Sequence, residues 1–210
     1  SGEGSTTSGN SSGSSSSGNS SSGSSSGGNN SSGNNSSGGS TSGDFKIVEK
    51  GKAEAKIVIA AKPSEKVLAA ATDLQDYLKR MTGVTVKVVY DSSDCTDGNY
   101  ILVGPSKYTA KLGIKQPTGY PNNEKVILKR VKNYLVLMGN DDGPFLGTQY
   151  AVTMFLEKQG CGWFGTQDLW QVVPSKTSIS VGSMDITHTP KFTSRENRVL
   201  SSLRDLGERW

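Results

Sequence analysis

The stretch NYLVLMGNDDGPFLGTQYAVTMFLEKQGCGWF, residues 133–164, decides the fold class of this 210-residue chain. It begins with an apolar run of strand composition, breaks at a glycine, and continues with apolar residues at helical spacing. Asp141 or Asp142 is expected to cap this helix, with Pro144 in its first turn and Gly160 at its end. A strand, a glycine turn and a helix in this order indicate a helix that packs on a sheet.

A second helix is expected upstream. Ser64 is a good N-cap, Glu65 suits the first turn, and Gly83 follows the last periodic residue. Apolar residues at three- and four-residue spacing define its buried stripe: Val67, Leu68, Ala71, Leu74, Leu78 and Met81. A shorter helix is expected near residues 107–112.

Strands flank these helices. The β-branched runs at 45–49 and 56–60 are expected to form a hairpin around Gly51. The other strands are expected at 84–90, 100–104, 124–131 and 133–139, the last two as a tight hairpin around Lys132 and Asn133, with short strands near 163–164, 169–173 and 178–181.

Composition divides the chain into three parts. Residues 1–43 hold 21 Ser, 12 Gly, 6 Asn, 3 Thr and one Glu, so they have no apolar surface to offset the entropy of ordering, and we expect a disordered linker. Residues 44–185 are expected to form one α/β (α+β) domain, a mixed β-sheet with two main helices packed on it. Residues 186–210 open a new segment.

The charge and the rare residue types exclude several function classes. The formal net charge of +4 is well mixed along the chain, so we expect no nucleic-acid partner, and no apolar run is long enough for a membrane-spanning helix. Cys95 and Cys161 are either one disulfide or two buried thiols. His188 is the only histidine, so we expect no zinc site, no Ser-His-Asp triad and no cofactor.

Several stretches, in order, resemble the N-terminal α/β domain of β-N-acetylhexosaminidases, α-glucuronidases and uncharacterised glycosidases of the same architecture. They are ATDLQDYLKRMTG with VTVKVV, NYILVG, the stretch from LVLMGNDDG to GCGWF, and the closing VVP, ISV and TPKFTSR, which together cover residues 44–198. The resemblance implies the zincin-like topology of that domain, which lacks the HExxH motif of zinc proteases, as this chain does. In the family this domain is non-catalytic and precedes a catalytic (β/α)8 barrel, of which residues 186–210 would be the beginning.

Two residues are candidates for substrate binding. Arg195 resembles an arginine at the first barrel strand that holds the sugar in hexosaminidases, although the family has glycine next and this chain has Glu196. A salt bridge or a contact at the domain join is the plainer interpretation of Arg195. Trp163, Phe164 and Trp170 could stack on sugar rings; aromatic pairs at strand entries usually belong to the core, and Trp170 is the one expected to be exposed.

Other polar groups have plainer interpretations. Asp141 and Asp142 are adjacent carboxylates in a turn before a helix, where caps are far commoner than the paired acids of glycosidases. Basic residues give the hairpin of residues 124–139 a basic face, which is expected to be a solvated sheet edge and not a site for acidic glycan or nucleic acid: Lys125, Lys129, Arg130 and Lys132.

These features predict a non-catalytic accessory domain of a secreted, bacterial, multidomain glycoside hydrolase active in polysaccharide degradation. Its expected partners are its own downstream barrel and an oligo- or polysaccharide substrate, with no membrane partner. We expect residues 1–210 alone, as a fragment of such an enzyme, to be inactive, with no catalytic or metal-ligating residues of their own. The alternative is an independent carbohydrate-binding or adhesion module on a flexible tether.

Overall fold

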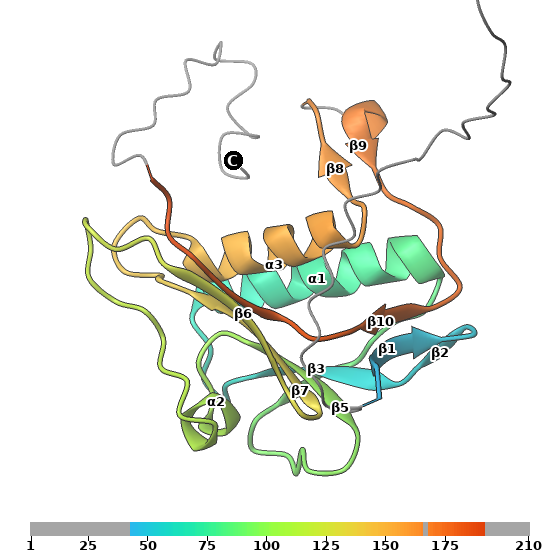
Figure 1. Ribbon diagram of the computed structural model, residues 1–210, viewed down its shortest axis with the longest axis horizontal. Helices are drawn as coiled ribbons and strands as arrows, with labels where there is room; N and C mark the ends of the chain where they lie inside the picture. Colours follow the sequence, from blue (N-terminus) through green and yellow to red (C-terminus); the bar gives the residue numbers. More distant parts are fainter. Residues whose placement is uncertain (1–42, 166–167, 192–210) are drawn as a thin grey trace, which may run out of the picture. The chain divides into compact units, whose positions relative to one another are not determined.

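A computed structural model describes residues 43–165 and 168–191. Its centre is a six-stranded mixed sheet (Figure 1) with the strand order β11-β6-β7-β5-β3-β4. The strands are β3 (Ala55–Ile59), β4 (Val88–Tyr90), β5 (Asn99–Val103), β6 (Val126–Val131), β7 (Tyr134–Gly139) and β11 (Asp185–His188). β4, β3, β5 and β7 pair in parallel, and β6 runs antiparallel to both of its neighbours.

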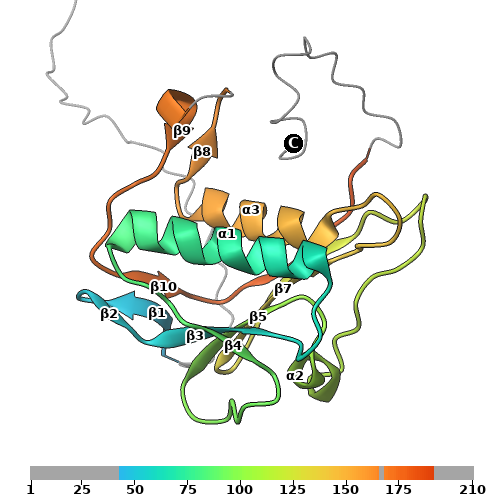
Figure 2. The same ribbon diagram turned by 180° about the vertical axis from the view of Figure 1, so that it is seen from behind.

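Two long helices cover one face of this sheet, as both views show (Figures 1 and 2). They are α1 (Glu65–Thr82) and α3 (Gly147–Lys158). The main apolar core lies between them and the sheet and includes Leu74, Ile101 and Phe155. The mixed sheet and its two main helices confirm the fold class predicted from the sequence.

The ends of α1 lie where the sequence predicts them. The Ser64 hydroxyl accepts a hydrogen bond from the Val67 amide, and Gly83 adopts the left-handed conformation that ends the helix. The stripe prediction is wrong at one position, because Leu68 is 47% exposed while the other five residues are buried. Leu68 is directly next to Val67, which turns its side chain about 100° away around the helix axis.

A second apolar cluster lies on the other face of the sheet, where α2 (Lys107–Lys111) packs. This cluster consists of Val58, Cys95, Tyr100, Leu102, Tyr108, Val136 and Met138. Cys161 belongs to the main core on the opposite face, and both cysteines are free and buried. The two thiols therefore do not form the disulfide that the sequence left open, and burial raises the pKa of Cys161.

Two smaller sheets complete the described part of the chain. One has the order β10-β1-β2, and the other pairs β8 with β9. Their bounds are β1 (Phe45–Glu49), β2 (Lys52–Ala53), β8 (Gly162–Trp163), β9 (Gln171–Val172) and β10 (Ile179–Val181), with a 3-10 turn, η1 (Asp168–Trp170), before β9. The predicted hairpin of 45–49 with 56–60 is wrong, because β1 turns at Lys50 and Gly51 onto β2, whereas β3 pairs with β4 and β5. β3 is buried at every residue except Lys56, which suits the centre of a sheet.

The strand β6 is not the solvated edge predicted for its basic residues. β11, which the sequence interpretation did not include as a strand, pairs along its outer side. The Lys129 ammonium lies 2.7 Å from an Asp185 carboxylate oxygen, and Arg130 donates to the Val181 carbonyl at 3.1 Å. Lys129 therefore contacts the outer strand β11, and Arg130 contacts the end of β10. In residues 43–165 and 168–191, no helix is both long and apolar enough to cross a bilayer.

Candidate functional site

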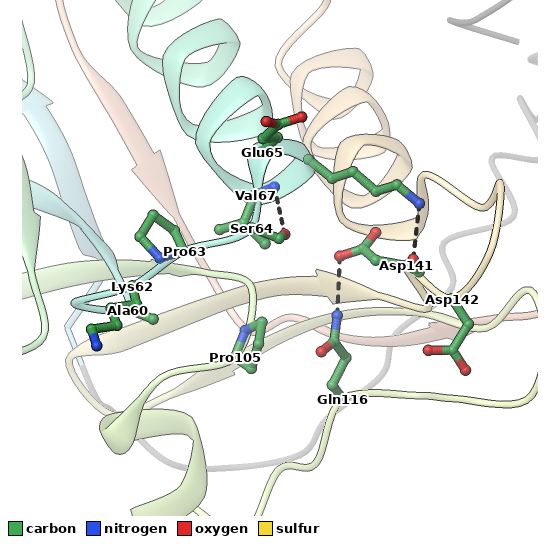
Figure 3. Close-up of a pocket in the computed structure, with 11 residues that line it drawn as sticks. Ala60, Lys62, Pro63, Ser64, Glu65, Val67, Pro105, Gln116, Asp141 and Asp142 are labelled. Carbon is green, nitrogen blue, oxygen red and sulfur yellow. Dashed lines mark hydrogen bonds between the residues drawn. The ribbon is translucent and has the colours of Figure 1, made fainter.

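A cavity in the described part of the chain lies where the parallel strands end. Its volume is about 560 Å³, and Figure 3 shows the residues that line it. They come from the first turn of α1 and from the loops after β3, β5, α2 and β7: Ala60, Lys62, Pro63, Ser64, Glu65, Lys66, Val67, Pro105, Gln116, Asp141 and Asp142.

The topology of the sheet places this cavity at a switch point. β3 continues through α1 to β4 on one side, whereas β5 continues through α2 toward β6 and β7 on the other side. The carboxyl ends of two adjacent strands whose connections diverge form the crevice in which open α/β sheets bind their ligands. The cavity therefore occupies the position at which open α/β sheets bind ligands.

Close backbone contacts fix the walls of the cavity. A Cβ atom on Gly104, which follows β5, would lie 2.7 Å from a methyl carbon of Val67 in α1. A Cβ on Gly139, at the end of β7, would lie 2.4 Å from the backbone of Gly147, the first residue of α3. Only glycine permits these approaches, so each helix begins directly against the end of a strand.

Asp141 is the best-connected carboxylate at this edge. One oxygen accepts from the Thr148 amide at 2.9 Å, and the other accepts from the Thr148 hydroxyl at 2.6 Å and from the Gln116 amide at 3.0 Å. The carboxylate thus binds a free amide of the first turn of α3 from the preceding loop. The prediction that Asp141 or Asp142 is the N-cap residue is wrong, because the N-cap position is Leu146, whose side chain makes no capping bond. The prediction for Pro144 is wrong, because α3 begins at Gly147 and Pro144 lies in the preceding loop.

Lys66 reaches from the first turn of α1 to the loop after β7. Its ammonium donates to three backbone carbonyls, those of Asp141 at 2.9 Å, Gly143 at 2.6 Å and Phe145 at 2.8 Å. This uses all three donors of a lysine on a single loop. The ammonium therefore organises the loop instead of facing the cavity as a free charge.

Asp142 has a smaller role in the same loop. Its carboxylate accepts from the Gly119 amide at 2.7 Å, and its own amide donates to the Asn140 side chain at 2.8 Å. Both carboxylates of the Asp141–Asp142 pair are thus bound to backbone amides. The arrangement is that of a structural turn and lacks the two facing carboxyl groups with which glycosidases work.

Asp91, which sequence reasoning missed, joins two loops at the same edge. One of its carboxylate oxygens accepts from the Ala61 amide at 2.9 Å, after β3, and the other from the Lys107 amide at 2.8 Å, at the start of α2. The only sequence signal is an acidic residue directly after a strand. Its two partners are 30 and 16 residues away, so their proximity depends on the sheet.

The cavity and Trp170 lie at opposite ends of α1. Trp170 belongs to η1, next to the β8–β9 pair, and β8 contacts α1 through Tyr77, eleven residues after Lys66 or about 16 Å along the helix axis. Trp170 is 54% exposed, as predicted. Phe164, interpreted as core, is 72% exposed, because Trp163 takes the buried side of β8 and the next residue points outward. Arg195 lies outside the described residues.

Among residues 43–165 and 168–191, no group of three or more His, Cys, Asp or Glu could hold a metal ion. In comparisons with known proteins, no protein-family model matches the chain, and no curated protein matches it. Among solved structures, the X-ray structure of Flavobacterium johnsoniae chitobiase matches with 16% sequence identity and a TM-score of 0.40. The alignment covers 73% of this chain and 19% of the chitobiase chain, so this chain spans about a fifth of that protein's length.

Proposed function

We propose that residues 44–185 are a non-catalytic accessory domain of a secreted multidomain glycoside hydrolase that acts in polysaccharide degradation and supports a downstream barrel. The observation that carries the proposal is the use of the acidic groups at the carboxyl edge of the sheet. Asp91, Asp141 and Asp142 all accept hydrogen bonds from backbone amides of loops and helix starts. Carboxylates bound in this way position the loops and helix starts that donate to them, which is a structural role.

The order of elements is compatible with the same proposal. The helix α1, the strands β4 and β5, the β6–β7 hairpin, the glycine turn, α3 and the Gly-Trp strand β8 follow one another along the chain. They fall on the stretches that resemble the N-terminal domain of hexosaminidases and α-glucuronidases. Under this proposal Arg195 is the substrate contact at the start of the barrel.

The direct test is turnover of aryl glycosides by the purified 210-residue protein. We expect no turnover of N-acetylglucosaminide, glucuronide or glucoside substrates above the rate in buffer. A measurable rate that survives repurification and disappears in Asp141→Asn but not in Asp142→Asn would overturn the accessory role, because it would make that carboxylate catalytic.

The exposed aromatic residues favour a second candidate, an independent carbohydrate-binding module. Phe164 and Trp170 are 72% and 54% exposed, and exposed aromatic rings can stack on sugar rings. This candidate predicts saturable binding of plant, host or chitin-type glycans that Trp170→Ala weakens. Tyr90→Ala, which removes an exposed aromatic ring elsewhere on the domain, is the matched control. Titrations of the parent protein that show no binding to any of these glycans would eliminate the carbohydrate-binding module.

A further inference from the structure

We infer that the outer face of the β8–η1–β9 segment is a docking surface for residues 199–206 of the same chain. This inference goes beyond the proposed function and does not rest on it, since it concerns how the chain continues after the described domain, whatever that continuation does. The surface is defined by the four apolar side chains Phe164, Leu169, Trp170 and Val172.

The docking surface gathers most of the exposed apolar residues of the described chain. The described chain has seven exposed large hydrophobic side chains, and four of them lie between residues 164 and 172. Leu169 is 87% exposed, and Phe164, Trp170 and Val172 are 72%, 54% and 51% exposed. Single exposed hydrophobic residues need no explanation, but a contiguous group marks a surface that another group covers.

The inner side of the same segment is firmly attached to α1. The Trp163 indole N–H donates to the Tyr77 hydroxyl at 2.6 Å, and the two rings make an edge-to-face contact with centroids 5.3 Å apart. Gln171 accepts from the Tyr77 hydroxyl and from the Arg80 guanidinium, both at 3.1 Å. The outward position of the neighbouring side chains is therefore built in, because strand residues alternate between faces.

Two glycines hold the exposed rings in place. A Cβ atom on Gly162 would lie 2.7 Å from an edge carbon of the Phe164 ring, and one on Gly165 would lie 2.7 Å from the Trp170 ring. Each ring thus rests on a glycine with its other side facing solvent. Rings that already rest against the backbone on one side lose less entropy when a partner covers them than fully free side chains would.

Residues 199–206 match this surface in chemistry. Val199, Leu203 and Leu206 follow one another at spacings of four and three, with Leu200 beside them, a pattern that predicts one apolar face of a helix. Aliphatic side chains in a row can pack against Leu169 and Val172 as well as against the aromatic rings. A sugar ring would use the aromatic rings but gain little from Leu169, the most exposed of the four.

The position at which the described chain ends makes this contact reachable. In Figures 1 and 2 the last described residues leave the sheet on the helix-covered side, toward the start of α1, and the β8–β9 segment projects on that side near the end of α1. The 18 residues of α1 span about 27 Å. The eight steps from Lys191 to Val199 reach about 26 Å when extended.

The test is hydroxyl-radical footprinting of the full 210-residue protein, with Leu68 as the internal reference. Leu169 is 87% and Leu68 47% exposed in the structure, so an uncovered Leu169 is expected to oxidise about twofold faster than Leu68. We expect the reverse order in the parent protein, because the docked segment covers Leu169. The double variant Leu203→Asp, Leu206→Asp should restore the faster oxidation of Leu169. The control Ser201→Asp, Ser202→Asp adds the same charge to the same segment and should not.

A second measurement changes the docking surface instead of residues 199–206. It applies if the aspartates introduced at 203 and 206 expose Leu169 for a reason other than loss of docking. Leu169→Ser should increase the rate of amide hydrogen exchange in residues 199–206, whereas Leu68→Ser should leave it unchanged. Three results would overturn the inference: Leu169 oxidising about twofold faster than Leu68 in the parent, protection that a hundredfold dilution removes (a second copy as the occupant), and protection that appears only when a glycan is added.

Discussion

Asp141 shows at the scale of a single residue how the edge of the sheet is held together. Its carboxylate joins the loop after β7 to α3 and to Gln116 through three hydrogen bonds, whereas the Asp142 carboxylate accepts one, from the Gly119 amide. Asp141→Asn keeps one acceptor oxygen and loses the other. We expect it to lower the free energy of unfolding by about 1–3 kcal/mol, measured by urea denaturation.

Asp142→Asn is the matched control for that prediction. Its single bond to an amide lies at an exposed position, so its loss is expected to cost less than about 1 kcal/mol. Equal losses from the two substitutions would show that the hydrogen bonds of Asp141 do not hold the start of α3.

Gly139 is a second residue on which the site depends. An added Cβ would meet the backbone of Gly147 at 2.4 Å, and backbone at the start of a helix cannot move aside as a side chain can. Gly139→Ala is therefore expected to destabilise the fold by about 1–3 kcal/mol, measured by thermal or urea unfolding. Gly182→Ala, where an added Cβ meets nothing within 4 Å, should be near neutral. A stable Gly139→Ala protein would mean that α3 does not press against β7.

At the scale of an element, the buried stripe of α1 predicts which of its leucines stabilise the fold. Leu74 lies in the main core and is fully buried, and Leu68 on the same helix is 47% exposed. Leu74→Ala should lower the free energy of unfolding by about 2–5 kcal/mol, because it leaves a cavity. Leu68→Ala should change it by less than about 1 kcal/mol, since exposed positions contribute little to packing. Similar losses in the two variants would contradict the stripe described for α1.

A cluster of three tyrosines beneath the sheet makes the fold sensitive to alkaline pH. The hydroxyls of Tyr100, Tyr108 and Tyr134 donate to backbone carbonyls of the loop between β4 and β5, and burial raises the pKa of each above the usual value of 10.0. The unfolded chain therefore loses these protons at lower pH than the folded chain. The stabilisation is complete below about pH 10 and is lost as the pH rises further.

Absorbance at 295 nm, followed together with the unfolding transition, checks this prediction. We expect part of the tyrosinate signal to appear only as the protein unfolds. A single titration near pH 10 by a folded protein would contradict the account.

The sequence predicts the elements that local chemistry determines. The ends of α1 follow from Ser64 and Gly83, and the β6–β7 hairpin follows from two apolar runs with a tight turn between them. Pairing between distant segments is not encoded locally. β1 pairs with β10, more than 130 residues later, and no pattern within residues 45–60 could distinguish that partner from β3.

In the candidate site, too, the sequence predicts local features but not contacts between distant segments. That an aspartate before α3 binds one of its free amides could be predicted, because acidic side chains before helices commonly do so, but the position of the N-cap at Leu146 could not. The partners of Asp91 could not, because they come together only at the edge of the assembled sheet. The exposure of Phe164 depends on which residue of a two-residue strand faces α1, which the aromatic composition alone does not decide.

At the scale of the whole molecule, the described domain places its two prominent surface features at opposite ends of α1. At the start of the helix, the cavity is surrounded by polar groups that bind one another and hold the loops in place. Near its end, four exposed apolar side chains face outward on a firmly attached segment. A well-ordered site of internal hydrogen bonds and a separate contact surface suit a domain that supports another one.

The measurement that tests the accessory role most directly is peptide mapping of the native protein isolated from its source. We predict peptides beyond Trp210 that add on the order of 250 residues with repeating strand and helix patterns and acidic residues at strand ends, as a catalytic barrel requires. A native chain whose last peptide ends at Trp210, or that continues into a segment too short for a barrel, would contradict the proposal and leave the carbohydrate-binding module as the better account.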